Sequence, residues 1–513
     1  MSNKNIKYEK ITPIEFTEDL LSACSNLYSN HYGKWSTKHP VEKMRGNNIR
    51  LSVEKLRDWF TSQNSNLYIA KYDNDIIGYA IAARIKVSRW GYVSWVTQLV
   101  VHTDYRNQNV AKQLLYSIWC ESSNFAWGIV SSNPYAIRAL EKATRRRSSP
   151  KIIRKHIEKL IEIGDNNLPY IKTDMEYKVD NNNASINTDF HVDHSAVPLM
   201  LSKVTSECIP WLLGDLEEGW EWIAFTFNSQ KQLQLSQSEI TELLETSEIV
   251  TKQAYSRMAI SDDQRWMQNS EEEVQFILNE CGLNRNDIVF DFGCGTGRHA
   301  IGLAKKGIHV VGIDYLEKNI EYAKKLSMGL DNVNFVLGDC RYYQFETKAK
   351  TIVCLYDVIG SYANEDENIK ILKRMSDSLE DGGNAIISVM NYELTQALAK
   401  HTFKLSETPN VILNLPTSNI MEKTGNIFDP DYYFIDEETE IVYRKERFDQ
   451  GNDLPIELIV RDKRYTKSEI VNLCKSVGLK VEFARYVNAR NWKTELDPTD
   501  KRAKEILIKC VKI

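Results

Sequence analysis

The sequence predicts an α/β protein built from two domains. Its 513 residues exceed the length of one ordinary domain and allow two full cores. In the second half, apolar strand-like runs alternate with helical patterns, and a glycine-rich turn follows the first run. The first half combines a hairpin, a longer strand and two helical patterns. We expect domains at 1–228 and 256–513, joined by a linker and cap helix at 229–255.

Composition is that of a soluble globular protein, with 42% hydrophobic and 26% charged residues. No apolar run has membrane-spanning length and no signal peptide opens the chain, so we expect a cytoplasmic protein with no membrane partner. The nine cysteines include no C-x-x-C pair, which favours reduced thiols. We expect no metal site, because His191, Asp193 and His194 lack further ligands at suitable spacing. The sequence does not indicate an oligomeric state.

The elements of the first half follow in a mixed order. Residues 67–81 form an expected hairpin with a polar turn, and 91–101 form a longer strand. A polar loop then leads into an amphipathic helix. Residues 125–130 form the next strand, after which Asn133 and Pro134 suit the start of a second helix.

This order resembles the GNAT acetyltransferases. Arg106 and Ala111 match the family's phosphate loop, whose backbone N–H groups at a helix N-terminus hold the pyrophosphate of acetyl-CoA. Asn109 replaces the family's glycine and Asn107 stands where glycine is common, although asparagine tolerates positive φ better than most residues. The acetyl-CoA-binding residues that the resemblance implies are Leu99, Val101, Arg106, Asn109, Ala111 and Asn133.

Two departures from the GNAT pattern leave open whether the first domain catalyses acetyl transfer. Gln98 lies in the strand where many members keep a glutamate as general base, and Leu140 stands where a tyrosine acid often lies. Tyr135 and His102 are nearby polar substitutes, and Tyr135 is the catalytic candidate of this domain. The alternative is a GNAT-shaped module that recognises a substrate without catalysis.

A basic run at 145–159 has two interpretations. We favour a solvated helix face. The other interpretation is a contact for phosphates of CoA or of a nucleic acid. Because the net charge of −5 gives no overall nucleic-acid signature, modification of RNA or another nucleic acid remains a disfavoured alternative.

The second half contains a βαβ nucleotide-binding signature. A strand at 288–292 leads into Gly293, Gly295 and Gly297, which let the backbone turn tightly and approach a ligand. A helical pattern follows, and the next strand ends at Asp314, which is placed to accept hydrogen bonds from ribose hydroxyls.

The turn reads Asp291-x-Gly-x-Gly-x-Gly and resembles motif I of the class I S-adenosylmethionine (SAM)-dependent methyltransferases. The resemblance continues through strands at 333–337, 351–355 and 384–389, and it implies a Rossmann-like, mostly parallel, seven-stranded sheet. Asp291 would hold the amino-acid end of SAM and Asp339 would read the adenine amine. The implied SAM-binding residues are Asp291, Gly293, Gly295, Gly297, Asp314, Asp339, Cys340 and Tyr356.

The methyl acceptor is harder to predict from the sequence than the cofactor. Methyl transfer needs mainly an aligned, unprotonated nucleophile and exclusion of water. Tyr356 and Asp357, at the end of the fourth strand, are the catalytic candidates. They match neither motif of the DNA amine or cytosine methylators. An insert before residue 466, with paired strands at 441–444 and 456–460, is expected to form a substrate lid.

A cap helix should begin at the capping box Ser236-x-x-Glu239 and, with Tyr255 and Trp266, cover the cofactor site. The sequence therefore predicts N- or O-methylation of a small metabolite, with acetylation of the same or a related compound by the first domain. The partners expected are the two cofactors, SAM and acetyl-CoA, and a small-molecule substrate.

Overall fold

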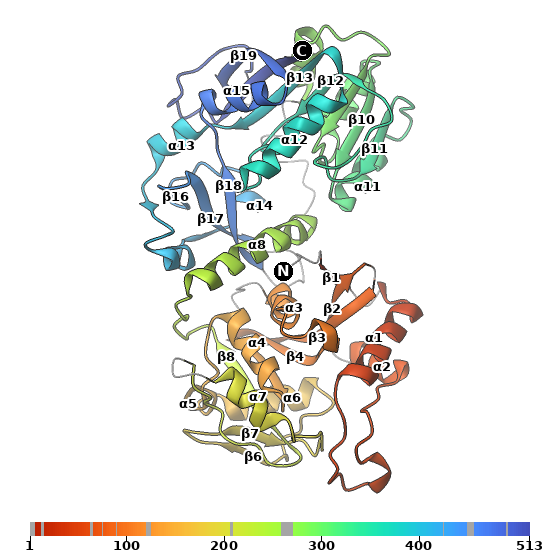
Figure 1. Ribbon diagram of the computed structural model, residues 1–513, viewed down its shortest axis with the longest axis vertical. Helices are drawn as coiled ribbons and strands as arrows, with labels where there is room; N and C mark the ends of the chain where they lie inside the picture. The colour runs from red at the N-terminus through yellow and green to blue at the C-terminus, as the bar shows by residue number, and fades with distance from the viewer. Residues whose placement is uncertain are drawn as a thin grey trace. The chain divides into compact units, whose positions relative to one another are not determined.

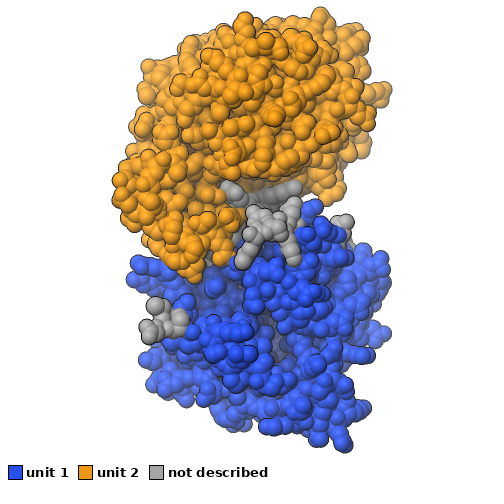
Figure 2. Space-filling view, in the orientation of Figure 1, with its two compact units in different colours: residues 1–234, 452–456 blue, residues 235–451, 457–513 orange. Residues whose placement is uncertain are grey.

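A computed structural model describes residues 6–11, 15–61, 65–73, 75–88, 90–119, 125–205, 209–257, 270–423, 425–448, 456–488 and 491–513. They form two compact units, Met1–Gln234 with Asn452–Ile456 and Leu235–Gly451 with Glu457–Ile513 (Figure 1; Figure 2). The first change of unit lies inside the segment expected as linker. The capping box is present, because Ser236 and Glu239 exchange hydrogen bonds. The helix that follows, α8 (Gln237–Arg257), belongs to the second unit. Trp266 lies outside the described residues.

The first unit is built on an eight-stranded mixed sheet. Its order is β1 (Lys7–Ile11), β2 (Ser65–Tyr72), β3 (Asp75–Val87), β4 (Gly91–Val101), β5 (Ala126–Ser131), β8 (Trp220–Phe227), β7 (Ala184–Asn187) and β6 (Tyr177–Val179). The helices are α1 (Glu18–His31), α2 (Val53–Thr61), α3 (Val110–Trp119), α4 (Pro134–Thr144), α5 (Pro150–Ile153), α6 (Ile157–Asn167) and α7 (Val197–Val204), with 3-10 turns at Glu42–Met44 and Thr103–Tyr105.

The expected hairpin, long strand and capped helix of this unit are confirmed. β2 and β3 pair antiparallel, and Asn133 caps α4 by accepting a hydrogen bond from the Tyr135 N–H at 2.9 Å. The β6–β7 hairpin was not anticipated, because its strands are only three and four residues long and lie in an asparagine-rich stretch. That hairpin makes β8 an interior strand between β5 and β7.

The expectation of a solvated basic face is wrong for Arg145, Arg146 and Arg147. α4 ends at Thr144, and Arg145 adopts a left-handed conformation (φ 51°) that turns the chain back toward the protein. Arg145 and Arg146 are 3% and 5% exposed, and Arg147 forms an ion pair with the buried Glu141 at 3.2 Å. Further along the run, residues 151, 154 and 155 are exposed as expected.

The second unit contains the predicted seven-stranded sheet. Its order is β11 (Val333–Leu337), β10 (His309–Asp314), β9 (Ile288–Phe292), β12 (Ala349–Cys354), β13 (Leu379–Met390), β20 (Glu505–Lys512) and β19 (Leu479–Val487). All neighbours pair parallel except β20, which is antiparallel to β13 and to β19. The helices of this part are α9 (Ser270–Glu280), α10 (Arg298–Lys305), α11 (Glu317–Leu326), α12 (Glu365–Ser378) and α15 (Lys467–Ser476).

Both faces of this sheet are covered. Val289 packs in a core with residues of α9 and α10, whereas Phe290, one residue later, packs in a core with residues of α12 and α15. Successive side chains of a strand point to opposite faces, so the continuous apolar run of β9 is what a doubly covered parallel strand requires. The carboxyl ends of the parallel strands therefore meet at one edge, where ligands bind in open α/β sheets.

The insert forms a sheet of its own. Its elements are α13 (Tyr392–Leu398), β14 (Thr402–Phe403), a 3-10 turn (Pro409–Asn414), β15 (Thr417–Ser418), α14 (Ile420–Lys423), β16 (Tyr433–Asp436), β17 (Ile441–Phe448) and β18 (Ile456–Lys463). β17 pairs with β18, as predicted. Among the helices that the structure describes, none is both long and apolar enough to cross a membrane.

Candidate functional site

The glycine-rich turn joins β9 to α10. Gly293, Gly295 and Gly297 all have positive φ, at 69°, 54° and 81°. A Cβ at Gly293 would lie 2.4 Å from Val358, and one at Gly297 would lie 2.6 Å from the Phe335 ring, so these glycines permit close packing inside the protein. A Cβ at Gly295 would meet no atom of the described residues within 4 Å. Gly295 is therefore the point at which a ligand can approach the backbone.

Asp291 on β9 lies directly before this turn. It is 3% exposed, and its Oδ2 has no hydrogen-bond partner among the described residues. Burial raises the pKa of Asp291 to about 7, although Arg298 and the backbone N–H of Ala300 act in the opposite direction. An unsatisfied buried acceptor costs roughly 1–3 kcal/mol. The position therefore suits a ligand that brings a hydrogen-bond donor or a positive charge.

Asp314 ends β10 and supports the turn. Its Oδ2 accepts a hydrogen bond from the Gly295 N–H at 2.9 Å, and its Oδ1 accepts one from the Leu316 N–H at 2.8 Å. Asn319 Nδ2 also lies 3.5 Å from Oδ1, and the carboxylate is at the edge of the sheet where ligands bind in open α/β folds. The expected ribose contact is compatible with this geometry, and the sequence did not reveal the structural role.

Asp339 follows β11 at the same edge of the sheet, but its carboxylate is already engaged. Arg341 donates to it from Nη2 at 2.6 Å and from Nε at 3.0 and 3.1 Å, and Arg341 also pairs with Glu367. An adenine amine would share Asp339 with this guanidinium. Burial, followed by the Asp339 charge, raises the pKa of the Cys340 thiol to about 12, so the thiol stays protonated at neutral pH.

Tyr356 and Asp357 follow β12, and both adopt positive φ, at 58° and 67°. Such conformations cost on the order of 1–3 kcal/mol in non-glycine residues and gather at functional sites. The Tyr356 hydroxyl donates a hydrogen bond to Glu273 on α9, and the Arg298 guanidinium lies 4.4 Å from the Tyr356 ring centroid. Tyr356 is thus held against α9 and α10, which leaves Asp357 as the better candidate for contact with an acceptor.

Asp357 lies near a buried charge network of the insert. Arg444 on β17 donates to Asp462 Oδ1 at 3.0 and 2.8 Å and to Glu446 at 2.5 Å, and Arg464 donates to Asp462 Oδ2 at 2.9 Å. Burial, followed by the Asp462 charge, raises the pKa of Asp357 to about 6, against the effect of the two arginines. Sequence reasoning missed this network. The alternation of Arg444 and Glu446 along a buried strand was the available signal.

Glu505 is a second residue that sequence reasoning missed. It begins β20, which runs antiparallel to β13, so it lies at the carboxyl edge of the parallel strands. It is 8% exposed, and its Oε2 has no hydrogen-bond partner among the described residues. Burial, followed by the charge of Asp357, raises the pKa of Glu505 to about 8. With Asp291 and Asp357, three carboxyl groups with raised pKa therefore lie at this edge.

Tyr255 lies on α8, the helix expected as a cap. Burial is the main cause of its raised pKa, and the charges of Arg444, Glu446, Asp462 and Asp357 also act on it. Its hydroxyl lies 3.6 Å from the Met421 sulfur of the insert. Tyr255 therefore lies close to the same acceptor-side carboxylates.

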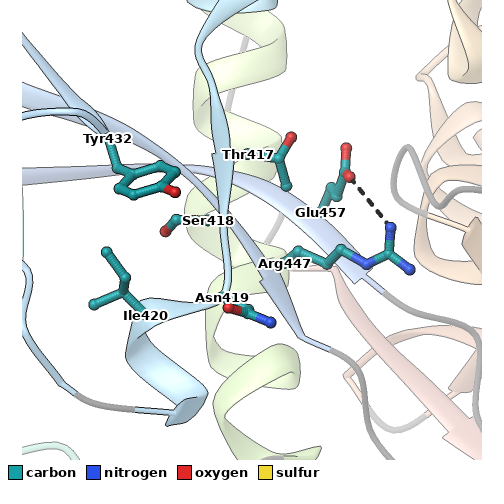
Figure 3. Close-up of a pocket in the computed structure, with 7 residues that line it drawn as sticks. All are labelled: Thr417, Ser418, Asn419, Ile420, Tyr432, Arg447 and Glu457. Carbon is teal, nitrogen blue, oxygen red and sulfur yellow. Dashed lines mark ion pairs between the residues drawn. The ribbon is translucent and has the colours of Figure 1, made fainter.

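A pocket of about 380 Å³ opens on the insert (Figure 3). Figure 3 shows the Arg447 and Glu457 side chains directed toward each other, with an ion-pair distance of 3.9 Å. The residues lining this pocket are Thr417, Ser418, Asn419, Ile420, Tyr432, Arg447 and Glu457. None of them belongs to the predicted cofactor site. Ser418 connects the two regions, because its hydroxyl donates to Glu446 of the charge network at 2.9 Å.

In the first unit, β4 and β5 part beyond Val96. The parallel ladder joins residues 93–96 of β4 to 126–129 of β5, although β4 continues to Val101 and β5 to Ser131. Thr97 is bulged out of the β3–β4 register, which bends β4 at the point of separation. Leu99 and Val101 thus lie beyond the last β4–β5 pair, where backbone groups can bind an extended ligand.

The predicted phosphate loop leads from this opening into α3. Asn107 and Asn109 have φ of 59° and 61°, so asparagine does supply the turn conformation, and Ala111 lies in the first turn of the helix. Arg106 departs from expectation. Its Nε donates to the Val101 carbonyl at 3.2 Å and its Nη2 donates to the His31 carbonyl, so the guanidinium braces the loop. A phosphate would instead meet the amino end of α3.

The remaining candidates of this unit lie at the amino end of α4. Asn133 uses its side chain as the helix cap, and Tyr135 occupies the first turn. Leu140 is fully buried, so it packs the core and offers no acid. Among the described residues, no group of three His, Cys, Asp or Glu side chains is placed to hold a metal ion.

Comparison with known proteins gives a separate match for each unit. Residues 289–383 match the family described as "Methyltransferase domain". The chain is similar to a ubiquinone biosynthesis O-methyltransferase from Rickettsia prowazekii (strain Madrid E), with 31% identity over 126 residues, covering 23% of this chain and 47% of that protein. It is also similar to a demethylmenaquinone methyltransferase from Staphylococcus aureus (strain JH9), with 29% identity over 114 residues, covering 21% and 46%. The chain thus spans about half the length of these relatives.

Solved structures similar to this chain include the CcbJ methyltransferase from Streptomyces caelestis, with 16% identity, a TM-score of 0.37 and coverage of 48% of this chain and 90% of that one. Another is a SAM-dependent methyltransferase from Clostridium acetobutylicum ATCC 824, with 17% identity, a TM-score of 0.34 and coverage of 52% and 98%.

In the first unit, residues 32–144 match the family described as "Acetyltransferase (GNAT) family". That match spans the β4–β5 opening, the phosphate loop and α4. The methyltransferase match spans the glycine turn and the ends of β10, β11 and β12. The chain is a two-domain fusion that resembles a GNAT acetyltransferase in its first unit and a class I SAM-dependent methyltransferase in its second.

Proposed function

We propose that the second unit is a SAM-dependent methyltransferase that acts on a nitrogen or oxygen atom of a small metabolite. The observation that carries this proposal is the pairing of an open approach at Gly295 with the unsatisfied, buried Asp291 Oδ2. SAM supplies an ammonium group and a carboxylate next to a nucleoside, and the turn offers complementary groups. A hydrogen bond between the ammonium group and Asp291 would satisfy the orphan oxygen.

The other residues of the edge complete this cofactor site. Asp314, at the end of β10, accepts from the Gly295 N–H and is the acceptor for the ribose hydroxyls. Asp339, braced by Arg341, lies after the next strand along the sheet and is the acceptor for the adenine amine. When bound, SAM supplies an activated methyl group, and the protein has to align the acceptor with it and exclude water.

Asp357 is the residue that we assign to the acceptor. With a pKa raised to about 6, it takes up a proton near neutral pH more readily than an ordinary aspartate does. Its left-handed backbone and the nearby charge network of the insert hold it at the end of β12. Glu505, whose Oε2 has no hydrogen-bond partner among the described residues, provides a second acidic group near the acceptor.

This function is tested by incubating the full chain with SAM and a fractionated metabolite extract, followed by mass spectrometry for products 14 Da heavier. We expect at least one methylated small molecule and equimolar S-adenosylhomocysteine. Asp357→Asn should reduce product formation by about 10²-fold or more, the range typical of a lost acid–base group. Asp377→Asn, at an exposed aspartate of α12, is the matched control. Methylation of added RNA, with no small product, would overturn the metabolite assignment.

The first unit has a second proposed function, acetyl transfer from acetyl-CoA. The parting of β4 and β5 beyond Val96 and the asparagine turn before α3 support it, because they offer backbone groups and a helix N-terminus to a thioester with a pyrophosphate. A thermal-shift titration of the full chain with acetyl-CoA is the test. A concentration-dependent stabilisation is expected. Its absence would favour the alternative of a recognition module that delivers a substrate.

A further inference from the structure

The first unit has a buried carboxylate in the region where the GNAT pattern lacked a base. Glu221 lies on β8, and its neighbour Trp222 pairs with Ser131, the last residue of β5. Ser131 and Ser132 lie just beyond the β4–β5 ladder, which ends at Val96 and Ile129. Glu221 is therefore placed beside the carboxyl end of β5, next to the opening between β4 and β5.

Glu221 and Gln98 both face α1. The Tyr79 hydroxyl donates to Gln98 Oε1 at 2.8 Å, and Tyr79 packs in one core with Tyr28 of α1. The charge of Glu221 in turn raises the pKa of Tyr28 and of Tyr32, which ends α1. The glutamine on β4 and the glutamate on β8 thus lie on the same face of the sheet, on either side of the end of β5.

The groups around the Glu221 carboxylate are hydroxyls, a backbone N–H and aromatic rings. Thr188 donates its hydroxyl to Glu221 Oε2 at 2.9 Å, and the Ser132 N–H also contributes a hydrogen bond. Tyr28 and Tyr32 stack with ring centroids 4.2 Å apart. The ring of Tyr170 stacks on Trp59, and the Glu221 charge also contributes to the raised pKa of Tyr170.

This environment makes Glu221 suited to accept a proton at neutral pH. The side chain is 7% exposed, and burial raises its pKa to about 7, whereas the Thr188 and Ser132 hydrogen bonds lower it. A general base is most effective when its pKa lies near the working pH. Tyrosine rings beside a carboxylate also attract an ammonium group, through the negative faces of the rings.

We propose that Glu221 is the general base of an acetyl-transfer site in the first unit, and that the acceptor of this site is a primary amine. The inference rests on the proposed acetyl transfer and names its base and its substrate class. The ammonium form of the acceptor gives one proton to Glu221. The amine nitrogen then forms a bond to the acyl carbon while the carbon–sulfur bond breaks. The nitrogen loses its second proton to the departing sulfur, so the products are an amide and a thiol.

Amine binding without acetyl-CoA tests the charge of the site. Calorimetry of the full chain with 2-phenylethylamine at pH 8 should show binding that weakens about tenfold or more in Glu221→Gln, because a charge-assisted hydrogen bond is lost. Glutamine has the same shape and can still accept from Thr188, so the variant should fold. Glu217→Gln, at a glutamate before β8 whose side chain is 67% exposed, is the matched control.

Turnover tests the proton transfer. Thiol release from acetyl-CoA with a panel of primary amines should fall by 10²–10⁴-fold in Glu221→Gln, the range of acid–base catalysis. In the wild type, the rate should rise with pH through about 7. Thr188→Val removes a hydrogen bond that favours the ionised carboxylate, so its profile should shift to higher pH without loss of the maximal rate.

Each outcome decides the proposal. Unchanged amine binding and an unchanged pH profile in Glu221→Gln would overturn the assignment, and so would a Thr188→Val profile that coincides with the wild type. Acetyl-CoA binding with no turnover of any amine would overturn the substrate class alone. Absence of acetyl-CoA binding, measured separately by thermal shift, would remove the acetyl-transfer function on which the inference rests.

Discussion

The two units each contain a strand, a tight turn and a helix, but they build the turn differently. In the second unit, three glycines adopt positive φ and Gly295 leaves its ligand side open. In the first unit, Asn107 and Asn109 adopt positive φ of 59° and 61°. The backbone requirement is thus met twice, by residues without a side chain in the second unit and by residues with a carboxamide side chain in the first. Loop conformation and cofactor access are separate properties, and each can be changed alone.

Substitutions of Gly293 and Gly295 should give the largest difference between loss of stability and loss of cofactor binding. Gly293→Ala should destabilise the protein by about 2–4 kcal/mol, because the new Cβ would lie 2.4 Å from Val358 in a left-handed conformation. Gly295→Ala should cost only about 1 kcal/mol of stability, since its Cβ meets open space, yet it should weaken SAM binding at least tenfold. Chemical denaturation and SAM titration of both variants measure the difference. Equal stabilities would contradict the assigned roles.

Asp291 should make the stability of the SAM-free protein depend on pH. Its pKa is raised from 3.8 to about 7, so the folded state favours the protonated carboxyl and the free energy of unfolding falls as pH rises from about 4 through 7. At 1.36 kcal/mol for each pKa unit, the loss is at most about 4 kcal/mol. Asp291→Asn should flatten this dependence and abolish SAM binding. Melting curves at pH 5.5 and 8 are sufficient, and parallel losses in the two proteins would refute the prediction.

Asp314→Ala should weaken SAM binding by about 1.5–3 kcal/mol, since hydrogen bonds to a charged acceptor are lost. It should also lower stability, because the Gly295 and Leu316 N–H groups lose their acceptor. Leu316→Ala, which keeps both N–H groups and the carboxylate, is a control for changes in helix packing. Calorimetry on proteins verified as folded provides the measurement. Full SAM affinity in Asp314→Ala would remove the ribose assignment.

Asn109→Gly should have the smallest effect of these substitutions, and it tests the phosphate loop of the first unit. Glycine retains the positive φ and removes the carboxamide from the approach side, so acetyl-CoA binding should tighten a few-fold. The fold should loosen by about 0.5–1 kcal/mol through added entropy of the unfolded chain. Thermal-shift titrations of both proteins with acetyl-CoA distinguish the effects. An identical response would mean that the Asn109 side chain does not limit cofactor access.

The sequence was most informative where local chemistry determines the structure. The order of strands around Asp291 and Asp314, the capping boxes and the asparagine turn were all predictable, because periodicity, caps and positive φ depend on neighbouring residues. The Thr466 capping box before α15, for example, has both reciprocal hydrogen bonds.

The residues that were missed depend on contacts between distant parts of the chain. Glu221 and Glu505 are single acids in apolar strands, and their raised pKa values arise from burial, which has no local pattern. The basic run misled for the same reason. Arg146 lies 5.0 Å from the Trp127 ring centroid and donates to Asn228, contacts that join three separate segments. Replacing the three arginines would therefore test stability, whereas Lys151, Arg154 and Lys155 are the exposed cations with which to test phosphate binding.

The central claim is that the glycine turn and its carboxylates form a SAM site, and calorimetric titration of the full chain with SAM tests it most directly. We predict one site with low-micromolar or tighter affinity, located in the second unit and lost in Asp291→Asn. A folded protein that shows no binding of SAM, or an Asp291→Asn variant that binds it with unchanged affinity, would contradict the assignment.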